Sequence, residues 1–530
     1  MLKLKENSLD WALNNIIKFN DTYVFPKPFE IEAITESWSE VKNYLKELDV
    51  YAEGVRPYRT AVTPKSRLGF RISTQLDPLD SIIYSGIIYE IYEDIERTRL
   101  PKEKELVLSF RLNPLPDGTL YDEEYNWDRF KEREKDLAES EDYKYVIVTD
   151  IADFYPSIYL HNIETALREC VKSSGKSTHA ECLINIIKAM HLNQTHKGLP
   201  VGPQFSRPIA ELILDTVDRV LDDQGFNFIR YVDDYRIYCN SESEAYEKLA
   251  FLAQKLYDLL NLKLNEQKTK ILTIEKFTNS YLKTHKDKVE DSVLEHFYEL
   301  VAELGISINP YEDVDLDSLD EDDLKRLREF NIVDVLEEEL KREEIDLGFI
   351  STLLGNLARF DNTEVADLIL KEENIRRLFP ILKSIITYLE RVRSFDAVQK
   401  HTIGKQMLDV LQNSFIGQLQ FNRAWILSLF TKGEEWDNQV TFTELLKNFN
   451  DNATTTRKLY LALGRAKNIR YFRENKQLNT ALDPWAKRAF IAAISCLPED
   501  ERRPWYKSRS LTSRDFLEKI IEKWAIKNHF

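Results

Sequence analysis

The segment 228–239 constrains this chain most, because two adjacent aspartates interrupt a run that otherwise suits a β-strand. Asp233 and Asp234 lie between Phe-Ile-Arg-Tyr-Val and Tyr-Arg-Ile-Tyr-Cys, and both flanks are rich in aromatic and β-branched residues. Such flanks favour strands, and a polar pair between them favours a tight turn. The pattern predicts a β-hairpin whose tip carries two carboxylates, although the pair taken alone also fits an ordinary polar turn.

A third aspartate ends another apolar stretch earlier in the chain. Residues 145–149 read as a strand that ends at Asp150. Three carboxylates at strand ends can hold two Mg²⁺ ions about 3.5–4 Å apart, an arrangement that clamps the attacking and leaving oxygens of nucleotidyl transfer. Mg²⁺ suits such a site because it takes few carboxylates and keeps water and substrate phosphates as its other ligands. We therefore predict Asp150, Asp233 and Asp234 as catalytic and metal-binding residues, with Mn²⁺ as a substitute ion.

The order of these motifs resembles the palm of reverse transcriptases. A strand that ends in aspartate (motif A, 150–158) is followed by a glycine-bearing loop and helix (motif B, 198–207) and then by the Asp-Asp hairpin (motif C, 231–234). The resemblance implies an α+β right-hand polymerase with fingers and palm. Motif B is similar to that of the bacterial abortive-infection polymerases and the wider group of defence-associated reverse transcriptases. Val201 stands where retroviral, retron and group II intron enzymes usually carry glutamine.

The same resemblance implies residues that bind the incoming nucleotide. Lys65 and Arg71 straddle a turn, as in the fingers hairpin that binds the triphosphate, although surface cations on an exposed hairpin are the alternative. A planar guanidinium binds two phosphate oxygens at once, whereas lysine acts as a point charge. In motif D, Lys268 or Lys270 would lie near the leaving pyrophosphate, and we take Lys268 as the candidate.

Two further positions in motifs A and B are candidates for contact with the nucleotide. Tyr155 falls where reverse transcriptases keep an aromatic residue that collides with a ribose 2′-hydroxyl, which implies selection of deoxynucleotides; an ordinary core ring is the alternative. Gly202 would allow the backbone to approach the nucleotide or template closely.

The domain organisation follows from where these motifs stop. We predict reverse-transcriptase-like fingers and palm over 1–285, an acidic helical connector over 286–345, and an α-helical repeat domain over 346–530, where successive segments have amphipathic helical periodicity. Basic and aromatic residues alternate between 457 and 476, a pattern that suits contact with a single strand as well as it suits a solvated helix face.

Composition indicates a cytoplasmic enzyme with more than one core. The 530 residues are 43% hydrophobic, no apolar run reaches the length of a membrane span, and the four cysteines have no zinc-binding spacing. The net charge of −17 argues against a nucleic-acid partner, but much of it is concentrated in an acidic run at 312–346.

The resemblance to abortive-infection polymerases implies a magnesium-dependent DNA polymerase of reverse-transcriptase type in antiphage defence, with protein-primed and template-independent synthesis. Its expected partners are dNTPs, a single-stranded DNA product, a non-coding RNA and further copies of the chain, but no membrane. Tyr44, on an expected helix in a polar segment, is a candidate priming residue. Two alternatives stay open: an RNA-templated reverse transcriptase that uses a dedicated non-coding RNA, and a catalytically inert scaffold that senses phage.

Overall fold

The structure, a computed structural model, forms two compact units that are discontinuous in sequence. It describes residues 1–190, 196–282, 300, 303, 332–359, 361–433, 436, 439–449, 452–477, 482–510 and 515–528. Unit 1 comprises Met1–Tyr23, Lys42–Arg56 and Leu76–Glu290, and unit 2 comprises Val24–Val41, Pro57–Gln75 and Asp291–Phe530. One helix, α3 (Trp38–Glu47), has residues in both units.

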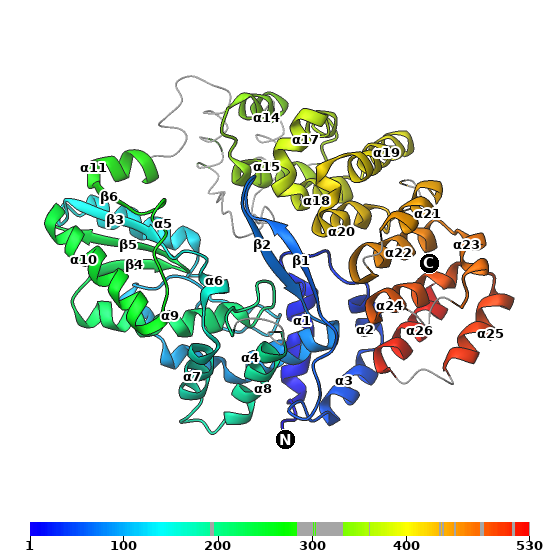
Figure 1. Cartoon of the computed structure of the whole chain (residues 1–530), viewed down its shortest axis with the longest axis horizontal. Coiled ribbons are helices and arrows are strands. Elements are labelled where there is room, and N and C mark those ends of the chain that lie inside the picture. The colour runs from blue at the N-terminus through cyan, green and yellow to red at the C-terminus, as the bar shows by residue number, and fades with distance from the viewer. Residues whose placement is uncertain are drawn as a thin grey trace. The chain divides into compact units, whose positions relative to one another are not determined.

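Unit 1 contains a four-stranded antiparallel sheet in the order β4-β5-β3-β6 (Figure 1). The strands are β3 (Tyr145–Asp150), β4 (Asn227–Tyr231), β5 (Asp234–Cys239) and β6 (Lys270–Thr273). The longer helices of the unit are α1 (Glu6–Phe19), α4 (Pro78–Thr98), α5 (Trp127–Glu139), α7 (Leu160–Cys170), α8 (Ser177–Met190), α9 (Ser206–Asp223) and α10 (Glu242–Lys255). The shorter ones are η1 (Lys102–Lys104), α6 (Phe154–Ser157), η2 (Leu256–Leu260), α11 (Ile274–Phe277) and η3 (Thr278–Leu282).

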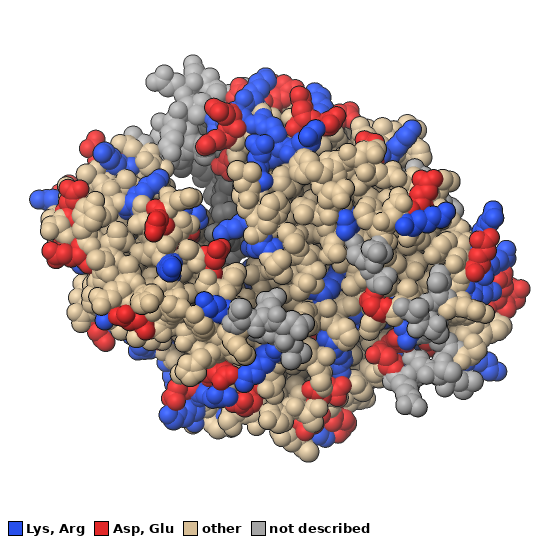
Figure 2. Space-filling view, in the orientation of Figure 1, with Lys and Arg blue, Asp and Glu red and all other residues tan. Residues whose placement is uncertain are grey.

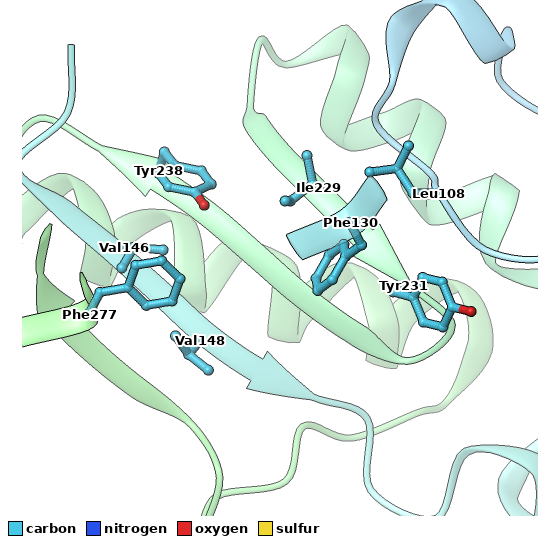
Figure 3. Packing of buried hydrophobic residues seen from close by; sticks show 8 residues of the cluster. All are labelled: Leu108, Phe130, Val146, Val148, Ile229, Tyr231, Tyr238 and Phe277. Atoms are coloured by element: carbon cyan, nitrogen blue, oxygen red, sulfur yellow. The ribbon is translucent and has the colours of Figure 1, made fainter. Parts of the chain in front are cut away.

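Both faces of this sheet are covered, which explains why its strands read as apolar runs. Side chains on one face pack against α5 and α11 in a buried cluster (Figure 3) of Leu108, Phe130, Val146, Val148, Ile229, Tyr231, Tyr238 and Phe277. On the other face, Tyr235 donates a hydrogen bond from its hydroxyl to Asp218 of α9 (3.0 Å). Alternation along each strand thus sends successive side chains into two different cores.

Unit 2 is built on helices from the second half of the chain. These are α14 (Ile332–Lys341), α15 (Leu347–Arg359), α16 (Ala366–Ile369), α17 (Glu372–Leu378), η5 (Phe379–Ile381), α18 (Leu382–Arg391), α19 (Ala397–Asn413), η6 (Phe415–Gln418), α20 (Gln420–Leu429), α21 (Gln439–Asn448), η8 (Asn452–Thr456), α22 (Arg457–Arg465), α23 (Ile469–Glu474), α24 (Pro484–Ala493), η10 (Ile494–Cys496), α25 (Glu499–Ser510) and α26 (Phe516–Asn528). Against them pack α2 (Glu30–Glu36) and the hairpin of β1 (Arg59–Pro64) and β2 (Phe70–Gln75).

Arginine and tryptophan side chains join the early segments to the late helices in unit 2. The Trp485 indole donates to the carbonyl of Pro57 (2.7 Å), and the guanidinium of Arg59 lies 4.8 Å from the Trp485 ring. Buried Glu30 forms ion pairs with Arg457 and Arg488. Residues that are more than 400 positions apart in sequence therefore share one core.

The architecture confirms part of what the sequence predicts. The expected α+β region and the helical character after residue 346 are both present, and no strand follows Thr273 among the described residues. The regularity of a helical repeat stays a prediction. The packing units differ from the predicted division at 285 and 346, because 24–41 and 57–75 pack with the late helices. Most of the predicted acidic connector, 286–331, lies outside the described residues apart from two positions.

Lys and Arg side chains are interspersed with Asp and Glu on the face shown in Figure 2. Among the described helices, none is both long enough and apolar enough to cross a membrane.

Candidate active site

The three predicted aspartates lie at the same edge of the unit 1 sheet. Asp150 ends β3 and Asp234 begins β5, and the two are directly paired in the antiparallel register. Asp233 lies in the turn between β4 and β5, and its carbonyl accepts a hydrogen bond from the amide of Ile151 (3.2 Å). The hairpin predicted from the sequence is therefore formed, with its carboxylates beside the end of the neighbouring strand.

Motif D supplies a cation to this edge. The ammonium group of Lys268 lies 2.5 Å from Oδ2 of Asp150, and the amide of Asn265 donates to the Asp150 carbonyl (2.9 Å). Desolvation opposes the charge of Lys268, but the Asp150 carboxylate and the nearby charges of Asp234 and Asp233 raise the pKa of Lys268 above its ordinary value. Lys268 thus lies with the aspartates and pairs directly with Asp150; its role near the leaving pyrophosphate stays a prediction.

The carboxylates differ in their surroundings. Asp150 is buried, and its Oδ1 atom has no hydrogen-bond partner among the residues that the structure describes. Burial raises the pKa of Asp234, with the neighbouring Asp150 carboxylate adding to the rise and Arg236 opposing it. A divalent cation would coordinate the unpaired oxygen of Asp150 and would stabilise the negative charge of the Asp234 carboxylate. The residues present therefore fit a metal ion.

The metal site itself is not assembled as a compact cluster. No three Asp, Glu, His or Cys side chains in the described parts of the chain lie close enough together to hold a metal ion. Like-charged carboxylates repel one another, and Lys268 already neutralises one oxygen of Asp150. The three-ligand arrangement predicted from the sequence is thus present in its strand positions but not in its side-chain geometry.

Motif B lies against the segment that follows Asp150. The amide of Leu199 donates to the carbonyl of Tyr155 (2.8 Å), and the amide of Gly198 donates to that of Ile158 (2.7 Å). Gly202 has φ +128°, a backbone conformation that residues with a Cβ atom rarely adopt. The loop therefore requires glycine at this position. The loop and Tyr155 belong to the same unit as the aspartates; their contact with a nucleotide stays a prediction.

We expect Tyr155→Ala to relax discrimination against ribonucleotides. The side chain is half-buried, and its ring contacts Phe154 edge-on at 5.4 Å. Loss of a steric contact in a binding pocket changes selectivity by about 10-fold or more, so the ratio of NTP to dNTP incorporation should rise by that amount. Tyr155→Phe is the matched control, because it keeps the bulk of the ring and should keep the selectivity. An unchanged ratio in Tyr155→Ala would make this tyrosine only a packing residue.

The predicted triphosphate-binding pair lies on the β1–β2 hairpin of unit 2. Thr63 is paired with Arg71, and the amides of Lys65 and Ser66 both donate to the carbonyl of Gly69 in the turn. Lys65 is exposed and Arg71 is half-buried. The two cations thus straddle a turn as predicted, but they belong to a different unit from the aspartates, and their role in binding nucleotide remains a prediction.

The candidate priming residue lies elsewhere in unit 1. Tyr44 is half-buried on α3 and lies near Arg56. It is not on the sheet that carries the aspartates, and its priming role stays a prediction.

The basic and aromatic segment between 457 and 476 is not the uniform surface that one sequence interpretation required. Arg457 and Lys458 are buried, and Arg457 forms an ion pair with Glu30. Arg473 and Lys476 are both paired with Glu501. The interpretation as a single-strand contact surface was wrong for these two residues, because both are buried. Arg457 pairs with Glu30, which is distant in sequence and invisible to a local pattern.

Sequence reasoning missed the buried charged residues behind the β4–β5 hairpin. Arg230 precedes the hairpin tip on β4 and forms ion pairs with Glu211 and Asp218 of α9. All three are almost inaccessible to solvent. The available signal was a charged residue inside an otherwise apolar strand, together with Glu211 and Asp218 among the apolar positions of an amphipathic helix, since buried charges are rarely tolerated without partners.

Comparison with protein families agrees with this geometry. Residues 99–310 match the family model described as reverse transcriptase (RNA-dependent DNA polymerase), a span that includes all of motifs A to D. The chain contains a reverse-transcriptase domain. With the aspartates at strand ends within that domain, it is a nucleotidyltransferase of the RNA-directed DNA polymerase type.

Other comparisons add little. No curated protein matches the sequence. Among solved structures, telomerase from Candida albicans in complex with a fragment of telomeric RNA is 12% identical with a TM-score of 0.32, covering 80% of this chain and 71% of that one. Apo telomerase from Candida tropicalis is 12% identical with a TM-score of 0.31, covering 80% and 74%.

Proposed function

We propose that this chain is a magnesium-dependent DNA polymerase of reverse-transcriptase type that acts in antiphage defence and primes synthesis on its own polypeptide. The single observation that carries the polymerase proposal is the direct pairing of Asp150 with Asp234 beside the turn that holds Asp233. It places three carboxylates at the end of one sheet, within a reverse-transcriptase domain. The cytoplasm is the proposed location.

Asp150, Asp233 and Asp234 would hold the metal ions. Bound Mg²⁺ would stabilise the charge that develops on the transferring phosphoryl group and would lower the pKa of the attacking hydroxyl. Lys268 would lie close to the same oxygens and could move from Asp150 to the departing phosphates, because its side chain is exposed over 58% of its surface. The other side chains of the site position and select the nucleotide.

Defence and protein priming are supported by the form of motif B, which resembles that of abortive-infection polymerases. Priming requires a hydroxyl from the polypeptide, and Tyr44 is the proposed residue. A tyrosine hydroxyl has an ordinary pKa of about 10, so it needs activation before it can attack a phosphorus atom. A divalent cation held by the aspartates would supply that activation.

The decisive experiment incubates the purified full-length protein with labelled dNTP and Mg²⁺, with and without added RNA. After denaturation, label that migrates with the polypeptide and resists RNase and phenol supports protein priming. Loss of this label in Tyr44→Phe would assign the primer. Asp233→Asn is the negative control.

The other outcomes select the alternatives. Incorporation only with added RNA, and label only on free nucleic acid, would favour an RNA-templated reverse transcriptase, which the description of the matching family favours. No incorporation under any condition, together with retained protection against phage by Asp233→Asn, would favour an inert sensing scaffold.

A further inference from the structure

The turn that carries Asp233 has an unusual backbone at Val232. This residue has φ +54°, a left-handed conformation that a β-branched side chain strongly disfavours. Such conformations persist only where the surrounding structure enforces them, and they are concentrated at functional sites. The contacts that hold Val232 in this conformation therefore also influence the orientation of the neighbouring Asp233 carboxylate.

Two buried side chains hold the backbone of Val232. Its amide donates to Oγ of Ser109 (2.9 Å), and its carbonyl accepts from the guanidinium of Arg230 (2.6 Å). Both polar groups of the peptide backbone of Val232 are thus bound to side chains that are 0% exposed. A turn held on both sides cannot relax easily to a more favourable φ.

Glu211 of α9 joins these two side chains to each other. Its Oε1 accepts from the Ser109 hydroxyl (2.7 Å), and its Oε2 accepts from Arg230 (3.0 Å) and from Arg99 (2.8 Å). Arg230 also donates to Asp218 through Nε (3.0 Å). The Ser109 hydroxyl has a single proton, which it donates in the hydrogen bond to Glu211. Its oxygen therefore acts only as an acceptor for the amide of Val232.

The segment that carries Ser109 is itself fixed to β4. The amide of Leu108 donates to the carbonyl of Arg230 (3.0 Å), and the amide of Arg230 donates to that of Leu106 (2.7 Å). Ser109 is therefore held in place through its backbone as well as through Glu211. The Ser109 hydroxyl is therefore a fixed acceptor for the hydrogen bond from the amide of Val232.

We infer that Ser109, together with Arg230 and Glu211, is a positioning residue that holds Val232 in its left-handed conformation and so aims the Asp233 carboxylate at the metal ions. Ser109 touches neither metal nor nucleotide in this role; it acts through the turn. The inference rests on the polymerase function proposed above. Loss of an outer hydrogen-bond partner of a metal-binding group typically costs about 10-fold or more in metal affinity or activity.

The test compares Ser109→Ala with Ser8→Ala in the full-length protein. Ser8 is the matched control, because it is equally buried and its hydroxyl donates to Oε1 of Glu90 at the same 2.7 Å, but it lies on α1. Mn²⁺ binding is titrated by electron paramagnetic resonance without dNTP, and the Mg²⁺ concentration for half-maximal incorporation is measured separately. Melting temperature is recorded for each variant.

Ser109→Ala should weaken Mn²⁺ binding and raise the Mg²⁺ requirement by about 10-fold, whereas Ser8→Ala should change neither. Ser109→Thr restores a hydroxyl and should restore much of the Mg²⁺ response. Unchanged metal binding in a folded Ser109→Ala, or an equal change in Ser8→Ala, would overturn the inference. If the wild-type protein binds Mn²⁺ but incorporates no nucleotide, the proposed function fails while the Mn²⁺ titration still tests Ser109.

Discussion

Replacement of Asp233 by asparagine should abolish nucleotide incorporation and leave the fold intact. The residue lies half-buried in a turn, not in a packed core, so the substitution changes a charge without creating a cavity. Asparagine keeps the size of the side chain but removes the negative charge that a divalent cation needs. Loss of a hydrogen-bond partner of a metal ligand can reduce activity by roughly 100-fold. Loss of a metal ligand itself should reduce nucleotide incorporation by more than that.

The measurement is incorporation of labelled dNTP at saturating Mg²⁺, with the melting temperature recorded in parallel. Asp258→Asn is the matched control, because Asp258 is an exposed aspartate of the same unit on η2. It should retain full incorporation. Activity of Asp233→Asn close to that of wild type, in a protein of unchanged melting temperature, would remove Asp233 from the site.

Replacement of Glu30 by alanine should destabilise unit 2 strongly. Glu30 is fully buried and faces the guanidinium groups of Arg457 and Arg488. Removal of one partner from a buried ion pair leaves the other charge without compensation and costs about 3–5 kcal/mol. For a unit of this size, the melting temperature of its transition should fall by roughly 10 °C.

Glu40→Gln tests whether burial causes that effect. Glu40 also comes from the early segment and pairs with Lys523 of α26 at 2.7 Å, but both side chains are about half exposed. An exposed pair contributes about 0–1 kcal/mol, so this variant should melt close to wild type. Equal shifts in the two variants, measured by calorimetry, would contradict the argument.

The sequence predicts the β4–β5 hairpin well because the pattern that specifies it is local. Strand-forming flanks and an acidic turn specify β4, β5 and the position of Asp233 without reference to the rest of the chain. The ordering of Asp150 before the Asp-Asp pair is likewise visible along the chain. Local patterns therefore carried most of the candidate site.

The sequence could not predict the contacts that join distant segments. The local sequence around Arg457 indicates a surface cation. Its burial depends on Glu30, which lies 427 positions earlier and is not visible in that local pattern. The β1–β2 hairpin belongs to unit 2 because it packs against helices such as α20. The spacing of apolar residues in the hairpin or in the helix does not reveal this packing. Pairings of this kind are decided by three-dimensional complementarity, which residue spacing does not encode.

The same long-range packing has a consequence for biosynthesis. Pro57, which lies two residues before β1, accepts a hydrogen bond from Trp485, 428 positions later in the chain. At a translation rate of about 5–20 residues per second, the segment that leads into the β1–β2 hairpin would wait roughly 20–90 s on the ribosome for that partner. Chain elongation thus sets the earliest moment at which the segment leading to Lys65 and Arg71 can be held by Trp485, and a newly made chain acquires that contact only when nearly all of the polypeptide has been synthesised.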